Sequence, residues 1–172
     1  MWLFGKKKEE LLIWQNLIMQ DSPNKLVMTE KQLKQATEQQ ASNDLRIIQD
    51  CIRIISETVK PDIFFSRMDL LKEKSKRLIE FEKYIKFSGA SPTNAFQEVL
   101  DNEQDAIYQF ISRCFNVAFE KAESMKTEKG KMNQFQKFYD NLQPYMNRMD
   151  EKNRKYIEWH YNHSVSKNSC TD

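Results

Sequence analysis

The sequence predicts an all-α protein, an antiparallel bundle of about five to seven helices around a central buried helix near residues 92–128. Glycine and proline occur only three and four times in 172 residues, which is typical of helical proteins because sheets need more turn residues. Residues 106–119 include ten apolar or aromatic residues out of fourteen. The polar residues here recur every three or four positions, so they share one strip of a helix and leave a wide apolar face. They are Gln109, Ser112, Arg113 and Asn116, followed by Glu120.

Residues 1–28 are predicted to form an N-terminal amphipathic segment and a loop. Trp2 and Phe4 stand next to three lysines at positions 6–8. This arrangement fits either contact with an anionic membrane surface or docking of the aromatic side chains on the bundle, and membrane contact is not favoured. The apolar patch over residues 11–19 is shorter than the ~20 residues that span a bilayer, and charge arrives too early for a signal peptide. We expect a cytoplasmic protein.

The next segment opens with Thr29 and Gln32, whose spacing is that of a capping box at a helix start. As far as Gln40 the segment is polar nearly all round, which predicts a weakly packed helix or a solvated arm. An apolar seam then runs to a helix end near residue 60. Pro61 favours a tight reversal into an antiparallel partner helix. The seam consists of Leu45, Ile48, Ile52, Ile55 and Val59.

The partner helix is predicted over residues 62–87. Its apolar face carries Phe64, Met68, Leu71, Leu78, Phe81 and Ile85. The charged run at residues 72–77 interrupts this face. The run fits a basic recognition patch or a solvated turn, and we favour the turn.

Residues 88–92 form a predicted loop before the central helix. The Asp101-Asn102 pair allows a break or kink in that helix, but we favour one long helix that ends at a C-cap at Gly130. The following helix is expected to break at Pro144. The last helix is predicted over residues 145–161, and the polar tail 162–172 is predicted to be disordered. Residues 29–161 would thus form a single domain.

No catalytic set is recognisable in the chain. The formal net charge is +2, and no glycine-rich phosphate loop occurs. The only histidines, His160 and His163, lie near the end of the chain and, with Cys170, would make at most a partial metal site. Cys51 and Cys114 are expected to be small core residues in a reducing compartment. We expect no enzymatic activity, no cofactor and no metal.

Residues 60–71, with the pattern Pro-x-x-Phe-Phe-Ser-Arg-x-Asp-Leu-Leu, resemble a group of bacterial and prophage-borne helical proteins of unknown activity. The resemblance spans roughly residues 45–161 and includes the Lys-Thr-Glu-Lys run at 126–129. It implies a helical domain and a bacterial or phage origin. Some members of this group carry a zinc ribbon whose cysteines are missing here. Arg67 and Asp69 are its charged residues, which we interpret as an ion pair or cap near the turn at Pro61.

The favoured function is protein interaction through a helix face, as a prophage-linked adaptor or inhibitor that binds an unknown protein or a second copy of itself. Positive charge and aromatic residues alternate in the last helix, so single-stranded nucleic-acid binding is the alternative. The acidic residues Asp150, Glu151 and Glu158 dilute that charge. The candidate partner-binding residues are Trp2, Phe4, Arg148, Lys152, Lys155, Tyr156, Trp159 and Tyr161.

Overall fold

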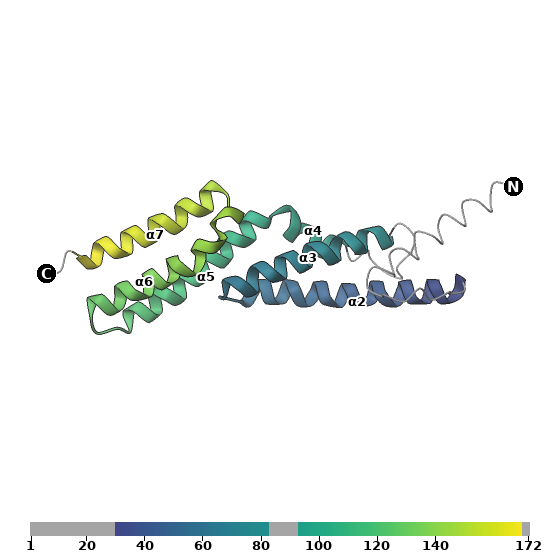
Figure 1. The fold of residues 1–172 in the computed structure, drawn as a ribbon, viewed down its shortest axis with the longest axis horizontal. Coiled ribbons are helices and arrows are strands. Elements are labelled where there is room, and N and C mark those ends of the chain that lie inside the picture. Colours follow the sequence, from purple (N-terminus) through teal and green to yellow (C-terminus); the bar gives the residue numbers. More distant parts are fainter. Residues whose placement is uncertain (1–29, 83–92, 170–172) are drawn as a thin grey trace. The chain divides into compact units, whose positions relative to one another are not determined.

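A computed structural model describes residues 30–82 and 93–169, and these are helical almost throughout (Figure 1). The all-α prediction is confirmed for this part of the chain. The elements are α2 (Glu30–Glu57), α3 (Pro61–Glu82), α4 (Thr93–Asp101), α5 (Glu103–Glu123), α6 (Glu128–Leu142), the 3-10 helix η1 (Gln143–Arg148) and α7 (Glu151–Ser169). Their contacts divide the described chain into two compact units. The first comprises the described parts of residues 1–52 and 69–97, and the second comprises residues 53–68 and those from 98 onward.

In the first unit, α2 presents a seam of buried residues at every third or fourth position, as a helix against one neighbour requires. The seam consists of Thr37, Ala41, Asp44, Ile48 and Cys51. The burial of Ile48 and Cys51 confirms two sequence predictions. The seam begins at Thr37, well before Leu45, so of the two alternatives predicted for the segment up to Gln40 the helix is confirmed and the solvated arm is wrong. Polar residues occupy two seam positions, which hid the helical period from a search for apolar residues.

The run at residues 72–77 lies within α3, and the prediction of a solvated turn there was wrong. Ser75 and Arg77 are buried. Arg77 donates two hydrogen bonds to Asp44, from Nε to Oδ2 at 2.6 Å and from Nη2 to Oδ1 at 2.5 Å. Gln40 Nε2 also donates to Asp44 Oδ1 at 3.1 Å. This bidentate ion pair joins α2 to α3, which lie side by side in Figure 1.

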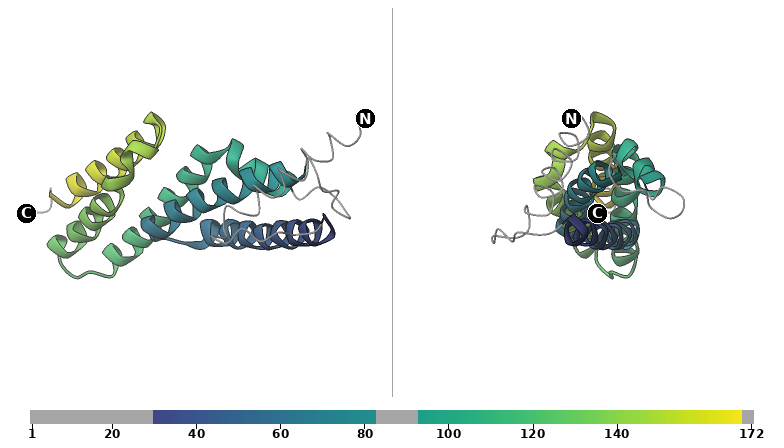
Figure 2. Two further views of the ribbon diagram at one scale, coloured as in Figure 1. Left: turned by 45° about the vertical axis from the view of Figure 1, so that its right-hand side comes forward. Right: turned by 90° about the vertical axis from the view of Figure 1, so that its right-hand side faces the viewer.

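In the second unit, α5, α6 and α7 pack against one another (Figure 2). The core has an aromatic centre, in which Phe64 stacks on Phe110 with ring centroids 4.1 Å apart. Phe65 stacks on Tyr145 of η1 at 4.5 Å, which fixes the turn between α6 and α7. The other buried apolar residues of these helices are Ile107, Ile111, Ala118, Ala122, Phe135, Phe138, Leu142, Met149 and Ile157.

Several helix ends differ from the predicted ones. Asn102 leaves helical geometry at φ −112° and ψ 37° and becomes the N-cap of α5, so the predicted single central helix is two helices. Gly130 lies in the first turn of α6, where its amide donates to Thr127 Oγ1 at 3.1 Å, and it is not a C-cap. The predicted break at Pro144 is confirmed. The last helix begins six residues later than predicted, at Glu151, and continues to Ser169.

The polar strip predicted on the central helix is partly confirmed, since Gln109 and Asn116 are exposed. Arg113 has a structural role instead. It donates from Nη2 to the carbonyl oxygen of Ile55 at 2.6 Å, and from Nε to that of Thr58 at 3.5 Å. Burial lowers the pKa of Arg113 from its ordinary value. These bonds satisfy carbonyls at the C-terminal end of α2 that no helical amide can reach. No described helix is long and apolar enough to cross a membrane.

Candidate partner-binding groove

The cations predicted on the last helix mostly contact neighbouring side chains. The Arg148 guanidinium lies over the Phe65 ring, 4.7 Å from its centroid. Lys152 Nζ lies 5.5 Å from the centre of the Tyr108 ring. Lys155 Nζ forms an exposed ion pair with Glu151 Oε1 at 2.5 Å, one helical turn earlier. Each of the three cations therefore contacts a different side chain of the second unit, and the three do not form one continuous basic surface.

The predicted aromatic residues of α7 have two different roles. Tyr156 packs against Tyr108 with ring centroids 4.9 Å apart, and desolvation by burial is the main cause of its raised pKa. The Tyr161 hydroxyl donates to Gln136 Oε1 at 2.5 Å, while its ring lies 4.7 Å from that of Tyr139. Both tyrosines therefore attach α7 to its neighbours. Trp159 is different, since 59% of its surface is exposed.

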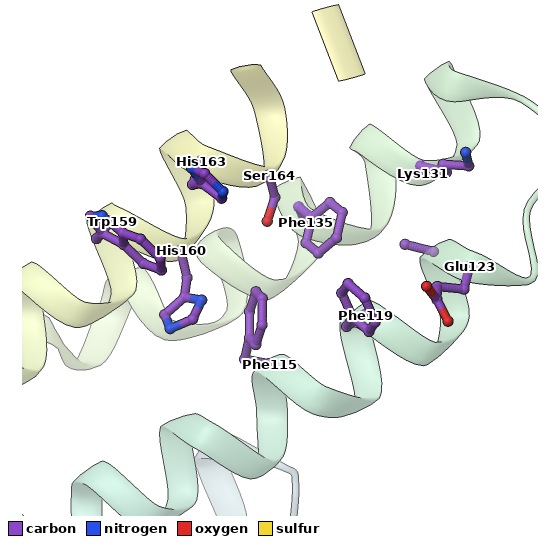
Figure 3. A pocket seen from close by; sticks show the side chains of 10 residues that line it. Phe115, Phe119, Glu123, Lys131, Phe135, Trp159, His160, His163 and Ser164 are labelled. Atoms are coloured by element: carbon purple, nitrogen blue, oxygen red, sulfur yellow. The ribbon is translucent and has the colours of Figure 1, made fainter. Parts of the chain in front are cut away.

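A groove of about 560 Å³ lies where Trp159 emerges, between the C-terminal part of α5, the start of α6 and α7 (Figure 3). Its walls are mainly aromatic, with one acidic and one basic side chain on the α5 and α6 side. The lining residues are Phe115, Phe119, Ala122, Glu123, Lys131, Phe135, Trp159, His160, His163 and Ser164. Of the predicted partner-binding residues that the structure describes, only Trp159 lines this groove. Trp2 and Phe4 lie outside the described residues.

Phe115 is the centre of the groove's aromatic wall. Its ring centroid lies 4.1 Å from that of His160, 6.0 Å from that of Phe135 and 6.2 Å from that of Phe119. Phe119 is 45% exposed, which is unusual for a phenylalanine in the middle of a packed helix. Sequence analysis assigned both phenylalanines to the apolar face of the central helix. Which part of that face a neighbouring helix covers is not visible in the pattern.

Two histidines form the α7 wall of the groove. His163 stacks on Trp159 with ring centroids 5.0 Å apart and an interplanar angle of 7°, and His160 meets the same indole edge to face at 4.7 Å. Desolvation by burial, and then repulsion from His163, lowers the pKa of His160 from its ordinary value. The neutral imidazole of His160 is therefore the form that packs in the folded protein.

This packing predicts a loss of stability in mild acid. Because the pKa of His160 is lower in the folded than in the unfolded chain, stability is complete above the unfolded value of about 6.5 and falls as the pH decreases through it. Urea denaturation at about pH 7.5 and about pH 5.5 measures the change. His160→Phe keeps the ring contacts and should reduce the difference between the two midpoints. An equal difference in both proteins would contradict the assignment to His160.

A polar network that sequence analysis missed sets the position of α7. Gln104 Oε1 accepts from the backbone amide of Asp150 at 2.9 Å and from Asn153 Nδ2 at 3.1 Å, and Gln104 Nε2 donates to the Arg148 carbonyl at 3.2 Å. Asp150 Oδ1 caps α7 by accepting from the Asn153 amide at 2.8 Å. Asn153 is almost completely buried. Because these bonds fix the start of α7 against α5, they also fix which α7 side chains reach the groove.

The structure describes only two of the three residues of the predicted partial metal site. His160 and His163 line the groove, whereas Cys170 lies outside the described residues. Within the described ranges, no group of three or more His, Cys, Asp or Glu side chains is placed to hold a metal ion.

No protein-family model, curated protein or solved structure matches this chain.

Proposed function

We propose that this protein is a non-enzymatic protein-interaction module that binds an apolar helical segment of another protein in the groove between α5, α6 and α7. The observation that carries the proposal is the exposure of two large aromatic side chains on opposite walls of one groove, Phe119 and Trp159. Exposed aromatic side chains that frame a pocket are the residues that most often dominate binding energy in protein interfaces. The bacterial or prophage origin rests on the resemblance of residues 60–71 to a group of unknown activity, whereas the role as a cytoplasmic adaptor or inhibitor is part of this proposal and is not implied by that resemblance.

The size and lining of the groove suit a peptide segment. Its volume of about 560 Å³ accommodates a few apolar side chains, and its aromatic walls offer them contact area. Glu123 and Lys131 supply polar groups at the rim, where a partner's polar residues would lie, and the Lys131 ammonium pairs with Glu128 at 2.7 Å. A helix with apolar residues on one face fits such a groove by the helix-in-groove mode of recognition.

Single-stranded nucleic acid is supported less well. Stacking on bases needs exposed aromatic rings next to free cations. Tyr156 and Tyr161 pack against α5 and α6, and Arg148 lies over Phe65. The experiment therefore includes nuclease treatment, which distinguishes nucleic-acid binding from protein binding.

The experiment compares the tagged wild-type chain with the double variant Phe119→Ala, Trp159→Ala in capture from bacterial lysate treated with nuclease. The expected result is a stoichiometric protein that survives nuclease and is lost with the double variant. That protein is then purified and titrated against the chain labelled with fluorotryptophan. The Trp159 resonance, assigned with Trp159→Phe, should shift on addition because the partner covers the indole.

Met125→Ala is the matched control, because Met125 is an exposed apolar residue on the same unit that lines neither this groove nor any other described here. It should capture the protein as the wild type does. Capture that is equal in all three chains would overturn the assignment to the groove. Binding that disappears with nuclease would instead support the nucleic-acid alternative.

A further inference from the structure

A second groove lies along α5 and α6, and its lining differs in chemistry from that of the first. It is bounded by the turn between α2 and α3, by α5 and by α6, and its volume is about 290 Å³. Its residues on α5, such as Val117 and Lys121, lie on a different face of the helix from Phe115 and Phe119. The apolar lining consists of Val59, Pro61, Cys114, Val117, Ala118, Phe138 and Leu142.

Three lysines surround this apolar floor, one from each wall. Lys60 comes from the turn, Lys121 from α5 and Lys137 from α6, and all three are exposed. No aspartate or glutamate lines the groove. Among the described residues, none of these lysines forms an ion pair. Three like charges around one hollow create a positive potential that a ligand of opposite charge would relieve.

The wall formed by the turn is held rigidly in place. Arg113 donates to the carbonyls of Ile55 and Thr58, and Cys114 Sγ donates to the Val59 carbonyl at 3.4 Å. Desolvation by burial raises the pKa of the Cys114 thiol to about 12, so it remains a protonated donor at neutral pH. The turn that carries Lys60 is therefore fixed against α5 before any ligand binds, which lowers the entropic cost of binding.

We infer that this groove binds an acidic segment of a protein, in which one apolar side chain enters the floor and carboxylates on either side of it meet Lys60, Lys121 and Lys137. Charge complementarity and the apolar floor together select this occupant. Nucleic acid fits less well because the aromatic ring in the lining, Phe138, is buried and offers no face for base stacking. The inference goes beyond the proposed function, since it concerns a separate groove and stands whether or not the aromatic groove binds a partner.

The test measures the binding of a fluorescent peptide, one phenylalanine flanked on each side by two glutamates, by anisotropy at low salt. We expect saturable binding that weakens as salt is added, because screening reduces the attraction. The triple variant Lys60→Glu, Lys121→Glu, Lys137→Glu should bind at least about tenfold more weakly. A peptide with glutamine in place of glutamate should lose affinity to a similar extent.

The control variant Lys76→Glu, Lys126→Glu, Lys129→Glu has the same change in net charge at exposed lysines outside the groove. It should retain the wild-type affinity within about twofold, since long-range effects of charge are screened. Val117→Trp fills the floor without altering charge and should also weaken binding. Absence of peptide binding, or equal losses in the two triple variants, would overturn the inference. Binding of a labelled oligonucleotide instead of the peptide, lost only in the first triple variant, would overturn it in favour of nucleic acid.

Discussion

Replacing Arg77 with methionine should lower the free energy of unfolding by about 3–5 kcal/mol, because it leaves the buried carboxylate of Asp44 without its cation. The side chain of Asp44 is completely buried and that of Arg77 is 7% exposed. Within the part of the chain that the structure describes, the amide of Gln40 would then be the remaining side-chain donor to this carboxylate. An amide does not compensate a negative charge that has been taken out of water.

Urea denaturation followed by circular dichroism measures this effect. Lys155→Ala is the control, because its ion pair with Glu151 is exposed and such pairs contribute at most about 1 kcal/mol. The double variant Asp44→Leu, Arg77→Met removes both charges and should recover much of the lost stability. If Arg77→Met were no less stable than Lys155→Ala, the buried ion pair would not be what joins α2 to α3.

This ion pair also shows why sequence analysis failed in part of the first unit. A search for apolar periodicity finds Ile48 but passes over Asp44, since a carboxylate is ordinarily assigned to solvent. Its partner is 33 residues away in the sequence. Nothing local to either residue indicates that the two meet. Interpreting the charged run that contains Arg77 as solvated produced the wrong turn at residues 72–77.

The second unit was predicted better because its signals are local. Pro144 ends a helix by the geometry of its own ring, and the apolar face of the central helix follows from spacing. The break at Asn102 was the alternative that sequence analysis did not favour, because an Asp-Asn pair is tolerated within a helix as well as at its ends.

The candidate groove was only partly predictable. Trp159 was identified because it stands among charged residues of the last helix. Phe119 was missed because a phenylalanine on an apolar face is normally covered. Whether α7 covers it depends on where α7 starts, which Asn153 and Gln104 determine through contacts between residues distant in sequence.

Replacing Phe110 with alanine should lower the free energy of unfolding by about 3–5 kcal/mol, through lost apolar contact and the cavity that remains. Phe110 is completely buried. Its ring stacks on Phe64 at an interplanar angle of 16° and meets Phe65 edge to face at 6.1 Å. Phe65 also stacks on Tyr145 and lies under the Arg148 guanidinium. Because the cavity would let Phe65 shift, it would also weaken the contacts that hold the 3-10 helix before α7.

Phe119→Ala provides the control, since it is the same substitution on the same helix at a side chain that is 45% exposed. It should cost far less, about 1 kcal/mol or under, because nearly half of its surface is already in contact with water. A double-mutant cycle with Phe64→Ala should give a coupling energy of about 0.5–1.5 kcal/mol for the stacked pair. Similar losses for Phe110→Ala and Phe119→Ala would mean that the aromatic centre is not the core of this unit. A large loss of unfolding free energy for Phe110→Ala, with a small one for Phe119→Ala, would show that the fold depends little on Phe119, whose exposed ring can then contact a partner.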